Sequence, residues 1–204
     1  MKYSQIPLET ANMIQFDSTI LLTDFDPATG EFERENIIGA TSGGSSFASN
    51  PNHVDLGEDM DNINGRMMEL QRFTHVDPVV SGTFVTIDTA MGKKLLALAD
   101  IDGNKLTPRI NITDEDFMDI WIVGNYSRKN GAKGGGSMAI HIKNAMNTGG
   151  FNWQSTKNGK GTFSYEFRGH YSLQNVDEIP FEAYITAGVD ETGVDETAVD
   201  ETAA

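Results

Sequence analysis

Four acidic residues in one polar segment come nearest to a catalytic pattern: Asp55, Glu58, Asp59 and Asp61. Two carboxylates can act as general acid and general base, as they do in glycoside hydrolysis. Spacing along the chain does not set the distance between them, and a segment rich in Gly, Ser and Asn more often holds acids for solvation or for intermolecular ion pairs. With no cysteine and no nucleophile elbow to supply a nucleophile, we expect no catalytic residues. A hydrolase using Glu58 and Asp59 is the least favoured hypothesis.

The tract ADIDGNKLTPR resembles part of a calcium-binding loop, because Asp100, Asp102 and Gly103 match some of its positions. When Gly103 is placed at the sixth position of an EF-hand loop, Leu98 falls at the first and Arg109 at the twelfth, where carboxylates are required. The tract is therefore expected to end a helix and form a turn, without a metal ion.

Phosphate-binding and zinc motifs are missing from the sequence. Lys133 and Lys160 stand beside glycines, but neither is followed by Ser or Thr, and neither fits the glycine-rich loop that cradles phosphate. The histidines lack any close ligand spacing; they are His53, His75, His141 and His170. We expect no cofactor and no metal.

The chain of 204 residues is strongly acidic, with a formal net charge of −15. Three copies of a VDET-containing pentapeptide fill residues 188–204, which hold six acids and no base and so leave −9 for residues 1–187. We expect this tail to be disordered. An acidic surface repels nucleic acid, so a conventional DNA-binding role is disfavoured. No signal peptide or membrane-length apolar run is evident, which predicts a soluble protein made in the cytoplasm.

The clearest element lies at residues 161–172, where aromatic residues and glycine alternate with polar residues. A two-residue period is typical of a half-buried strand, and it places Phe163, Tyr165, Phe167 and Tyr171 on one face. Gly169 interrupts this row, which suggests a bulge, a bend or a close backbone approach.

Most other segments also read as strands. Helical spacing occurs once, at 89–100, where Asp88 or Thr89 can cap the start. The expected fold is mainly β, an antiparallel sandwich or half-barrel flanked by one helix, in one domain over 1–187. Extended runs are expected at 16–25 and 31–39, joined by a turn at 26–30, and at 67–76, 78–88, 105–112, 119–126, 138–143 and 181–185.

Two segments are predicted to be loops. Residues 127–136 are basic and glycine-rich, and residues 41–66 are rich in Gly, Ser, Asn and Asp. A loop of about 20 residues is uncommon in a compact domain unless it binds something. The second loop is therefore the leading contact surface, with candidate residues Phe47, Val54, Asp55, Leu56, Glu58, Asp59, Asp61 and Arg66.

Several blocks, in order, resemble the major tail protein of long-tailed bacteriophages of Gram-positive hosts, the tail tube subunit. They are IIGATSGGSSFASNPNHVDLGEDMDN, VVSGTFVTID, DEDFMDIWIVGNYS, the run from MAIHIKN to FRGHYS, and PFEAYI. The likeness spans about residues 10–186 and excludes the VDET tail.

The resemblance implies a virion protein that assembles with itself, as rings of six that share sheet edges and stack into a tube. In this family long loops bridge the rings, a role that suits 41–66, and the tube surrounds a tape-measure protein and later conducts DNA. Partners would include the tape-measure, tail-terminator and distal tail proteins, and DNA would pass without specific binding. Acidic or polar residues could line the lumen, with candidates Glu33, Glu35, Glu69 and Gln71.

A different class of function stays open beside this one. An acidic β-sandwich displayed on a virion or cell could use exposed loops and aromatic residues to hold carbohydrate or protein. A glycan screen and the oligomeric state would separate the two hypotheses.

Overall fold

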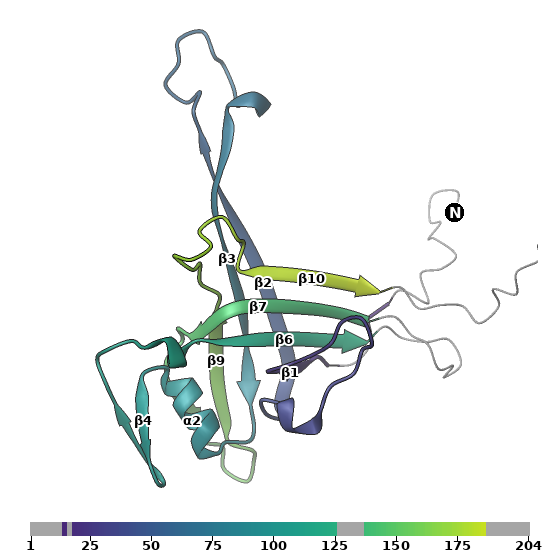
Figure 1. The fold of residues 1–204 in the computed structure, drawn as a ribbon, viewed down its shortest axis with the longest axis vertical. Helices are drawn as coiled ribbons and strands as arrows, with labels where there is room; N and C mark the ends of the chain where they lie inside the picture. Colours follow the sequence, from purple (N-terminus) through teal and green to yellow (C-terminus); the bar gives the residue numbers. More distant parts are fainter. Residues whose placement is uncertain (1–13, 16–17, 126–136, 187–204) are drawn as a thin grey trace, which may run out of the picture.

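In the residues that the structure describes, the fold is mainly β with one helix, as the sequence predicted. The computed structural model describes residues 14–15, 18–125 and 137–186 (Figure 1); the predicted loop at 127–136 and the VDET tail at 188–204 lie outside them. The strands are β1 (Ile20–Leu22), β2 (Thr41–Asp55), β3 (Gln71–Phe84), β4 (Ala99–Asp102), β5 (Lys105–Pro108), β6 (Met118–Asn125), β7 (Ser137–Asn147), β8 (Asn152–Gln154), β9 (Thr162–Arg168) and β10 (Phe181–Thr186). The helix is α2 (Thr89–Leu96), and three short 3-10 turns are η1 (Arg34–Asn36), η2 (Met68–Leu70) and η3 (Asp114–Asp116).

Eight strands form one antiparallel sheet that is folded into two halves. One half contains β1, β6, β7 and β10, and the other contains β9, β3 and β2, with β8 on β9. The halves cross steeply in Figure 1. They share β7. Its first part pairs with β6 and β10, and near its end Met146 pairs with Arg168 and Asn147 with Phe167, both in β9. The result is the predicted half-barrel arrangement.

Two apolar clusters hold the sheet. The larger one includes Phe84 of β3, Ile120 of β6 and Leu95 of α2, which are fully buried, and so joins both halves of the sheet to the helix. The smaller cluster centres on Trp121, whose ring centroid lies 5.6 Å from that of Phe25 in the segment after β1. The predicted buried strand at 119–126 is confirmed by β6, where Ile120 to Val123 are at most 8% exposed.

The alternating segment at 161–172 forms β9 as predicted, but the strand ends at Arg168. Tyr165 and Phe167 are buried. Tyr171 lies beyond the strand, and its exposed fraction is 37%. Gly169 follows β9 at a point where no side chain fits: a Cβ would lie 2.8 Å from Ile142 and 2.9 Å from Pro78. The predicted close backbone approach is confirmed.

The predicted helix begins correctly and ends early. Asp88 caps it, accepting a hydrogen bond from the backbone N–H of Met91 at 2.7 Å. The predicted end at residue 100 is wrong, because the helix stops at Leu96 and Ala99 already starts β4. The Asp-Gly pair at 102 and 103, expected to end the helix, instead ends β4 and begins the turn at Gly103 and Asn104, because Asp102 pairs with Lys105 of β5.

Residues 41–55, predicted as the first part of a long loop, form the strand β2. The prediction is wrong because pairing with β3, from Thr41↔Phe84 to Asp55↔Gln71, supplies hydrogen-bond partners that outweigh the low strand propensity of Gly, Ser and Asn. The loop proper is confined to the connection between β2 and η2.

The two strands predicted around Pro78 are one continuous strand, β3. Proline lacks an N–H group, and a residue in a strand directs its N–H and C=O to the same side. The carbonyl of Pro78 accepts from the N–H of Gly169 at 3.0 Å, just beyond the β3–β9 ladder, which begins at Val79. The backbone nitrogen of Pro78, which has no hydrogen to donate, therefore lies at the end of the β3–β9 ladder, where proline is tolerated.

Of the predicted hairpin at 16–39, the residues that the structure describes form a single bridge between the two segments. Leu22 and Ile37 form an isolated antiparallel bridge, but β1 pairs with β6 and the returning segment contains η1 instead of a strand. Across the ranges given above, no helix is long and apolar enough to cross a bilayer.

Candidate assembly surfaces

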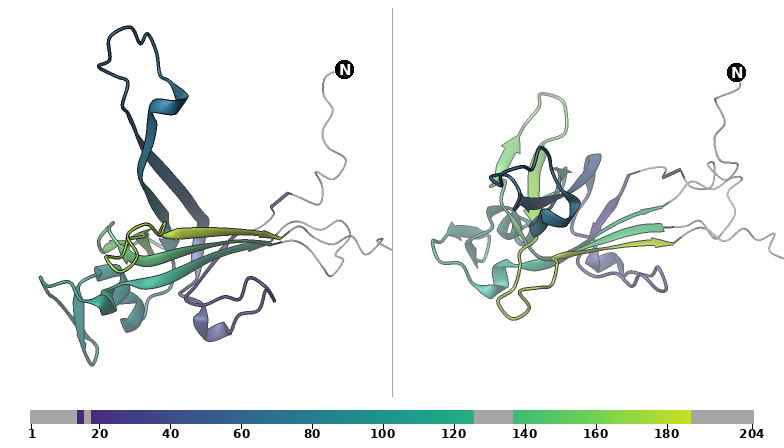
Figure 2. Two further views of the ribbon diagram at one scale, coloured as in Figure 1. Left: turned by 45° about the horizontal axis from the view of Figure 1, so that its top comes forward. Right: turned by 90° about the horizontal axis from the view of Figure 1, so that it is seen from above.

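The β2–β3 hairpin extends beyond the body as an arm, defined here as residues 49–78. β9 pairs with β3 only from Val79 to Phe84, so the arm is a two-stranded ribbon that projects away from the other strands (Figures 1 and 2). Its eight β3 residues before Val79 span about 26 Å at the usual rise of a strand. An isolated two-stranded ribbon is marginally stable in water, so the arm needs a partner or local anchors.

Apolar side chains are exposed along the outer part of the arm. Met68 is 82% exposed, and five others are 42–51% exposed: Val54, Leu56, Met60, Met67 and Phe73. Single exposed apolar residues are ordinary, but six gathered on one arm make it the leading candidate for a contact surface.

Seven of the eight predicted contact residues lie together at the far end of the arm: Val54, Asp55, Leu56, Glu58, Asp59, Asp61 and Arg66. Phe47 does not belong with them. It pairs with Val80 within the body, and its ring lies 5.6 Å from that of Phe181 against the larger core cluster. Phe47 therefore packs against the core of the body and lies outside the arm. Contact of the other seven with another molecule stays a prediction.

The end of the arm is a closed turn with a small hollow. Leu56 donates its N–H to the carbonyl of Leu70 at 3.0 Å, and the carboxylate of Asp55 accepts from the N–H of Gly57 at 2.9 Å. A hollow of about 230 Å³ is lined by Asp55, Gly57, Glu58, Ile63, Gly65 and Arg66. Within the described chain no group of three His, Asp or Glu side chains could hold a metal ion.

Tyr171 anchors the base of the arm, a role that the sequence did not reveal. Its hydroxyl accepts a hydrogen bond from the backbone N–H of Val76 at 3.0 Å. Together with the bond from Gly169 to Pro78, this ties the segment after β9 to the point where the arm leaves the body. The two bonds fix the direction of the arm, because they act where β3 has lost β9 as a neighbour.

The body has open sheet edges. In the part of the chain that the structure describes, β2 pairs only with β3, and β10 pairs only with β7. An edge strand exposes backbone donors and acceptors to a further strand. β2 is 15 residues long and mostly exposed, which makes it a long open edge.

The end of the body opposite the arm carries aromatic rings and lysines. β8 and the β8–β9 turn lie beside the Phe84 end of β3, whereas the arm leaves from its Gln71 end (Figure 1). Trp153 is 68% exposed, with its ring 6.4 Å from that of Phe163 and inclined by 12°. Lys157 and Lys160 are exposed, and residues 148–165 contain no acid.

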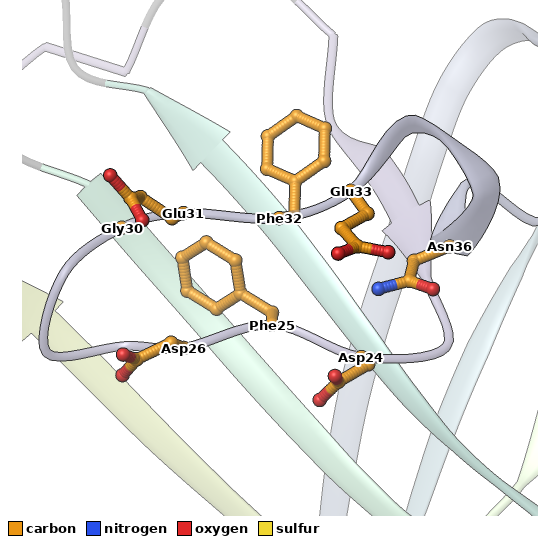
Figure 3. A pocket seen from close by; sticks show the side chains of 8 residues that line it. All are labelled: Asp24, Phe25, Asp26, Gly30, Glu31, Phe32, Glu33 and Asn36. Atoms are coloured by element: carbon orange, nitrogen blue, oxygen red, sulfur yellow. The ribbon is translucent and has the colours of Figure 1, made fainter.

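The segment between β1 and η1 surrounds a hollow of about 730 Å³ (Figure 3). Its lining combines four carboxylates with two phenylalanine rings and consists of Asp24, Phe25, Asp26, Gly30, Glu31, Phe32, Glu33 and Asn36. Hydrogen bonds from the backbone N–H of Ala28 and the hydroxyl of Thr29 lower the pKa of Asp26. The carboxylates make the hollow repulsive to anions.

The four predicted lumen residues do not share a surface. Glu33 lies at the hollow of Figure 3, with Glu35 two residues further on in η1. Glu69 and Gln71 lie in η2 and at the start of β3, at the end of the arm. Alternation within each segment could not show that the segments are far apart. Their exposure to a lumen stays a prediction.

Arg109 is the last residue of the tract that resembled a calcium loop, and its guanidinium donates hydrogen bonds to several groups. Its Nε donates to Asp100 at 3.0 Å, and its terminal nitrogens donate to Thr113, to the carbonyl of Asn111 and to Asp116. Burial alone would raise the pKa of Asp116, but hydrogen bonds from Arg109 and Thr113 hold that pKa below its ordinary value. The carboxylate that a calcium ion would need at Asp100 therefore binds a guanidinium.

No model of a known protein family matches the chain, and no curated protein matches its sequence. Among solved structures, a chain from the tail of an empty gene transfer agent (GTA) particle, computed with helical refinement and C6 symmetry, aligns with a TM-score of 0.41. That alignment has 12% identity and covers 75% of this chain and 91% of the other. A chain from the virion of a native GTA particle gives a TM-score of 0.39 and 9% identity over 83% and 96% of the two chains. Likeness at this level carries no conclusion about assembly or function.

Proposed function

We propose that the chain is a structural subunit of a bacteriophage tail, and that its copies form rings of six that stack into a tube through which DNA passes. In this proposal the protein belongs to the virion, catalyses no reaction and needs no cofactor. Its other partners would be the tape-measure protein inside the tube and the proteins that end the tube, as the sequence resemblance implies.

The observation that carries the proposal is the combination of open edges and a projecting arm in one small subunit. β2 and β10 each lack a second neighbour in the described chain, so a copy placed edge to edge could add strands to both. A ring removes the edges altogether, because every subunit supplies one edge and receives another. A subunit that acted alone would need to protect 15 residues of exposed edge.

The arm suits contact along the tube axis. It reaches beyond the body by about 26 Å at the rise of a strand, and it exposes six large apolar residues. Such a surface gains free energy at about 25 cal/mol per Å² of apolar area that is covered. A neighbouring ring is the natural cover, since the ring contacts themselves use the body.

The acidic composition suits a conduit for DNA. Residues 1–187 carry a net charge of −9, and phosphates are not attracted to such a surface. Screening limits repulsion to about 8 to 10 Å at physiological salt, so only carboxylates that face the channel would act. In the proposed tube, the hollow of Figure 3 would turn its four carboxylates towards the channel.

Electron microscopy of the concentrated, purified protein tests the proposal directly. We expect rings and tubes, and light scattering after size exclusion should give masses at multiples of six times 22.3 kDa. A protein lacking residues 188–204 should assemble in the same way. A chain that stays monomeric at every concentration and salt would overturn the proposal.

A variant with a shortened arm tests whether the arm joins one ring to the next. Residues 54–72 are replaced by Asn-Gly, which suits a two-residue hairpin between the paired residues His53 and Phe73. We expect folded subunits that form rings but no tubes. Normal tubes would show that the arm does not join rings. Deletion of all of 41–66 would be a poor test, because it removes β2 from the sheet.

A further inference from the structure

We propose that the arm of one copy docks on the opposite end of a second copy, at a receiving surface formed by Phe151, Trp153, Lys157 and Lys160. This inference rests on the proposed function, and it names the partner surface for the arm. It joins two surfaces at opposite ends of the same chain, so the contact is heterologous and can repeat without limit.

Charge complementarity selects this pairing. The outer arm holds Asp55, Glu58, Asp59, Asp61 and Glu69 against Arg66 and Arg72. The receiving surface holds two exposed lysines, and residues 148–165 around it contain no acid. In a described chain with many more acids than bases, such a stretch is unusual. Opposite charges at the two ends favour head-to-tail contact, and like charges disfavour contact between two arms.

The apolar groups also match. The arm presents Met60, Met67 and Met68, which are flexible and adapt to the shape of a partner, and Met68 is 82% exposed. The receiving surface presents Trp153, 68% exposed, backed by the nearly parallel ring of Phe163. Thioether sulfur atoms make favourable contacts with aromatic rings, so methionines on tryptophan give a specific contact as well as buried area.

Geometry permits the contact. β3 runs from the arm at Gln71 to Phe84, and Phe84 pairs with Phe163 in β9, directly beside β8. The arm and the receiving surface therefore lie at opposite ends of β3, along the direction of this strand (Figure 1). Copies translated along this direction bring each arm to the receiving surface of the next copy.

The cysteine-free sequence allows a direct test by disulfide trapping. In full-length protein we would combine Met68→Cys with Lys157→Cys and oxidise the assembled sample. The expected result is a ladder of disulfide-linked multimers on a non-reducing gel, because every copy carries both halves of the contact. A mixture of the two single variants should give linked heterodimers and no ladder. A control that pairs Met68→Cys with Glu35→Cys, an exposed residue of η1, should give no ladder.

A charge swap provides an independent readout. Lys157→Glu with Lys160→Glu should reduce tube formation at least tenfold, and adding Glu58→Lys with Asp59→Lys should restore it. Circular dichroism confirms folding of each variant. In the Trp121→Phe background, the emission of Trp153 should shift to shorter wavelength on assembly, since its ring becomes covered.

The outcomes separate this inference from the proposed function. Tubes that form normally from the lysine-reversed protein, with no trapped ladder, would overturn the docking surface and leave the tail tube proposal standing. Absence of any oligomer from the unmodified protein would overturn both. A shift in Trp153 emission on adding glycans, with no assembly, would also overturn the proposed docking surface, because the ring would then bind carbohydrate.

Discussion

The side-chain amide of Asn147 donates a hydrogen bond to the backbone carbonyl of Leu95 at 2.6 Å and so ties β7 to the end of α2. The same amide nitrogen donates to the carbonyl of Gly150 at 3.1 Å, and its oxygen accepts from the N–H of Glu166 at 2.9 Å. Asn147 is 4% exposed. One buried side chain therefore satisfies three backbone groups from three different segments.

Replacing Asn147 with Leu should destabilise the subunit by about 3 kcal/mol, because buried backbone groups that lose a hydrogen-bond partner cost about 1 to 3 kcal/mol each. Chemical denaturation of the purified variant measures this. Asn147→Asp should also be destabilised, but less so at acid pH, since burial raises the pKa of the carboxyl group and its protonation restores a donor. A loss below about 0.5 kcal/mol in the Leu variant would contradict the assigned role.

Gly82→Ala should destabilise the fold by about 1 to 3 kcal/mol through overpacking. A Cβ at this position would overlap the hydroxyl of Tyr165 and lie 3.0 Å from the carbonyl oxygen of Gly44. Tyr165→Phe removes that hydroxyl, together with its 2.7 Å hydrogen bond to Ser45. In a double-mutant cycle, Tyr165→Phe should therefore cost less in the Gly82→Ala background than in the natural sequence. Simple additivity would mean that the overlap is relieved elsewhere.

Tyr171→Phe should loosen the arm with little effect on global stability. The variant removes the acceptor for the Val76 N–H at the base of the arm. Hydrogen exchange at Val76 should become faster, while the core strands keep their protection and the free energy of unfolding changes by less than about 1.5 kcal/mol. Unchanged exchange at Val76 would show that Gly169 and Pro78 hold the arm by themselves.

The Asp116–Arg109 pair should make stability dependent on acid pH. The folded state lowers the pKa of Asp116, so the unfolded state binds the proton more readily. The stabilisation is therefore complete above the ordinary Asp pKa of about 3.9 and is lost as the pH falls through the lower folded value. Unfolding midpoints of the natural protein and of Asp116→Asn should differ at pH 6 and converge towards pH 2. A constant difference across this range would exclude ionisation of Asp116 as its source.

Elements with a strong periodic pattern could be predicted, and those that depend on distant partners could not. β9 and β6 show alternation or continuous apolar character, and the start of α2 has a capping aspartate. β2 has neither signal: Ser45, Ser49 and Asn50 become part of a strand only because they pair with β3. Its assignment requires knowledge of the pairing, which no local window contains.

The candidate surfaces were predictable to a similar extent. The acidic end of the arm was found because its composition is unusual for a long connection. Tyr171 and Asn147 were not found as anchors, since Val76 lies 95 residues from Tyr171, and Leu95 and Glu166 lie 52 and 19 residues from Asn147. Trp153 gave no signal beyond its aromatic character, because exposure depends on which face of a three-residue strand is left open.

The strand β7 has a mechanical consequence, since it belongs to both halves of the sheet. A pull on β10 by a neighbour on one side would travel through β7 into β9 and β3, and then to β2 on the far side. Backbone hydrogen bonds along this route would be loaded together across several ladders. In the proposed tube, the subunit would therefore transmit tension from one neighbour to the next through its own backbone ladders.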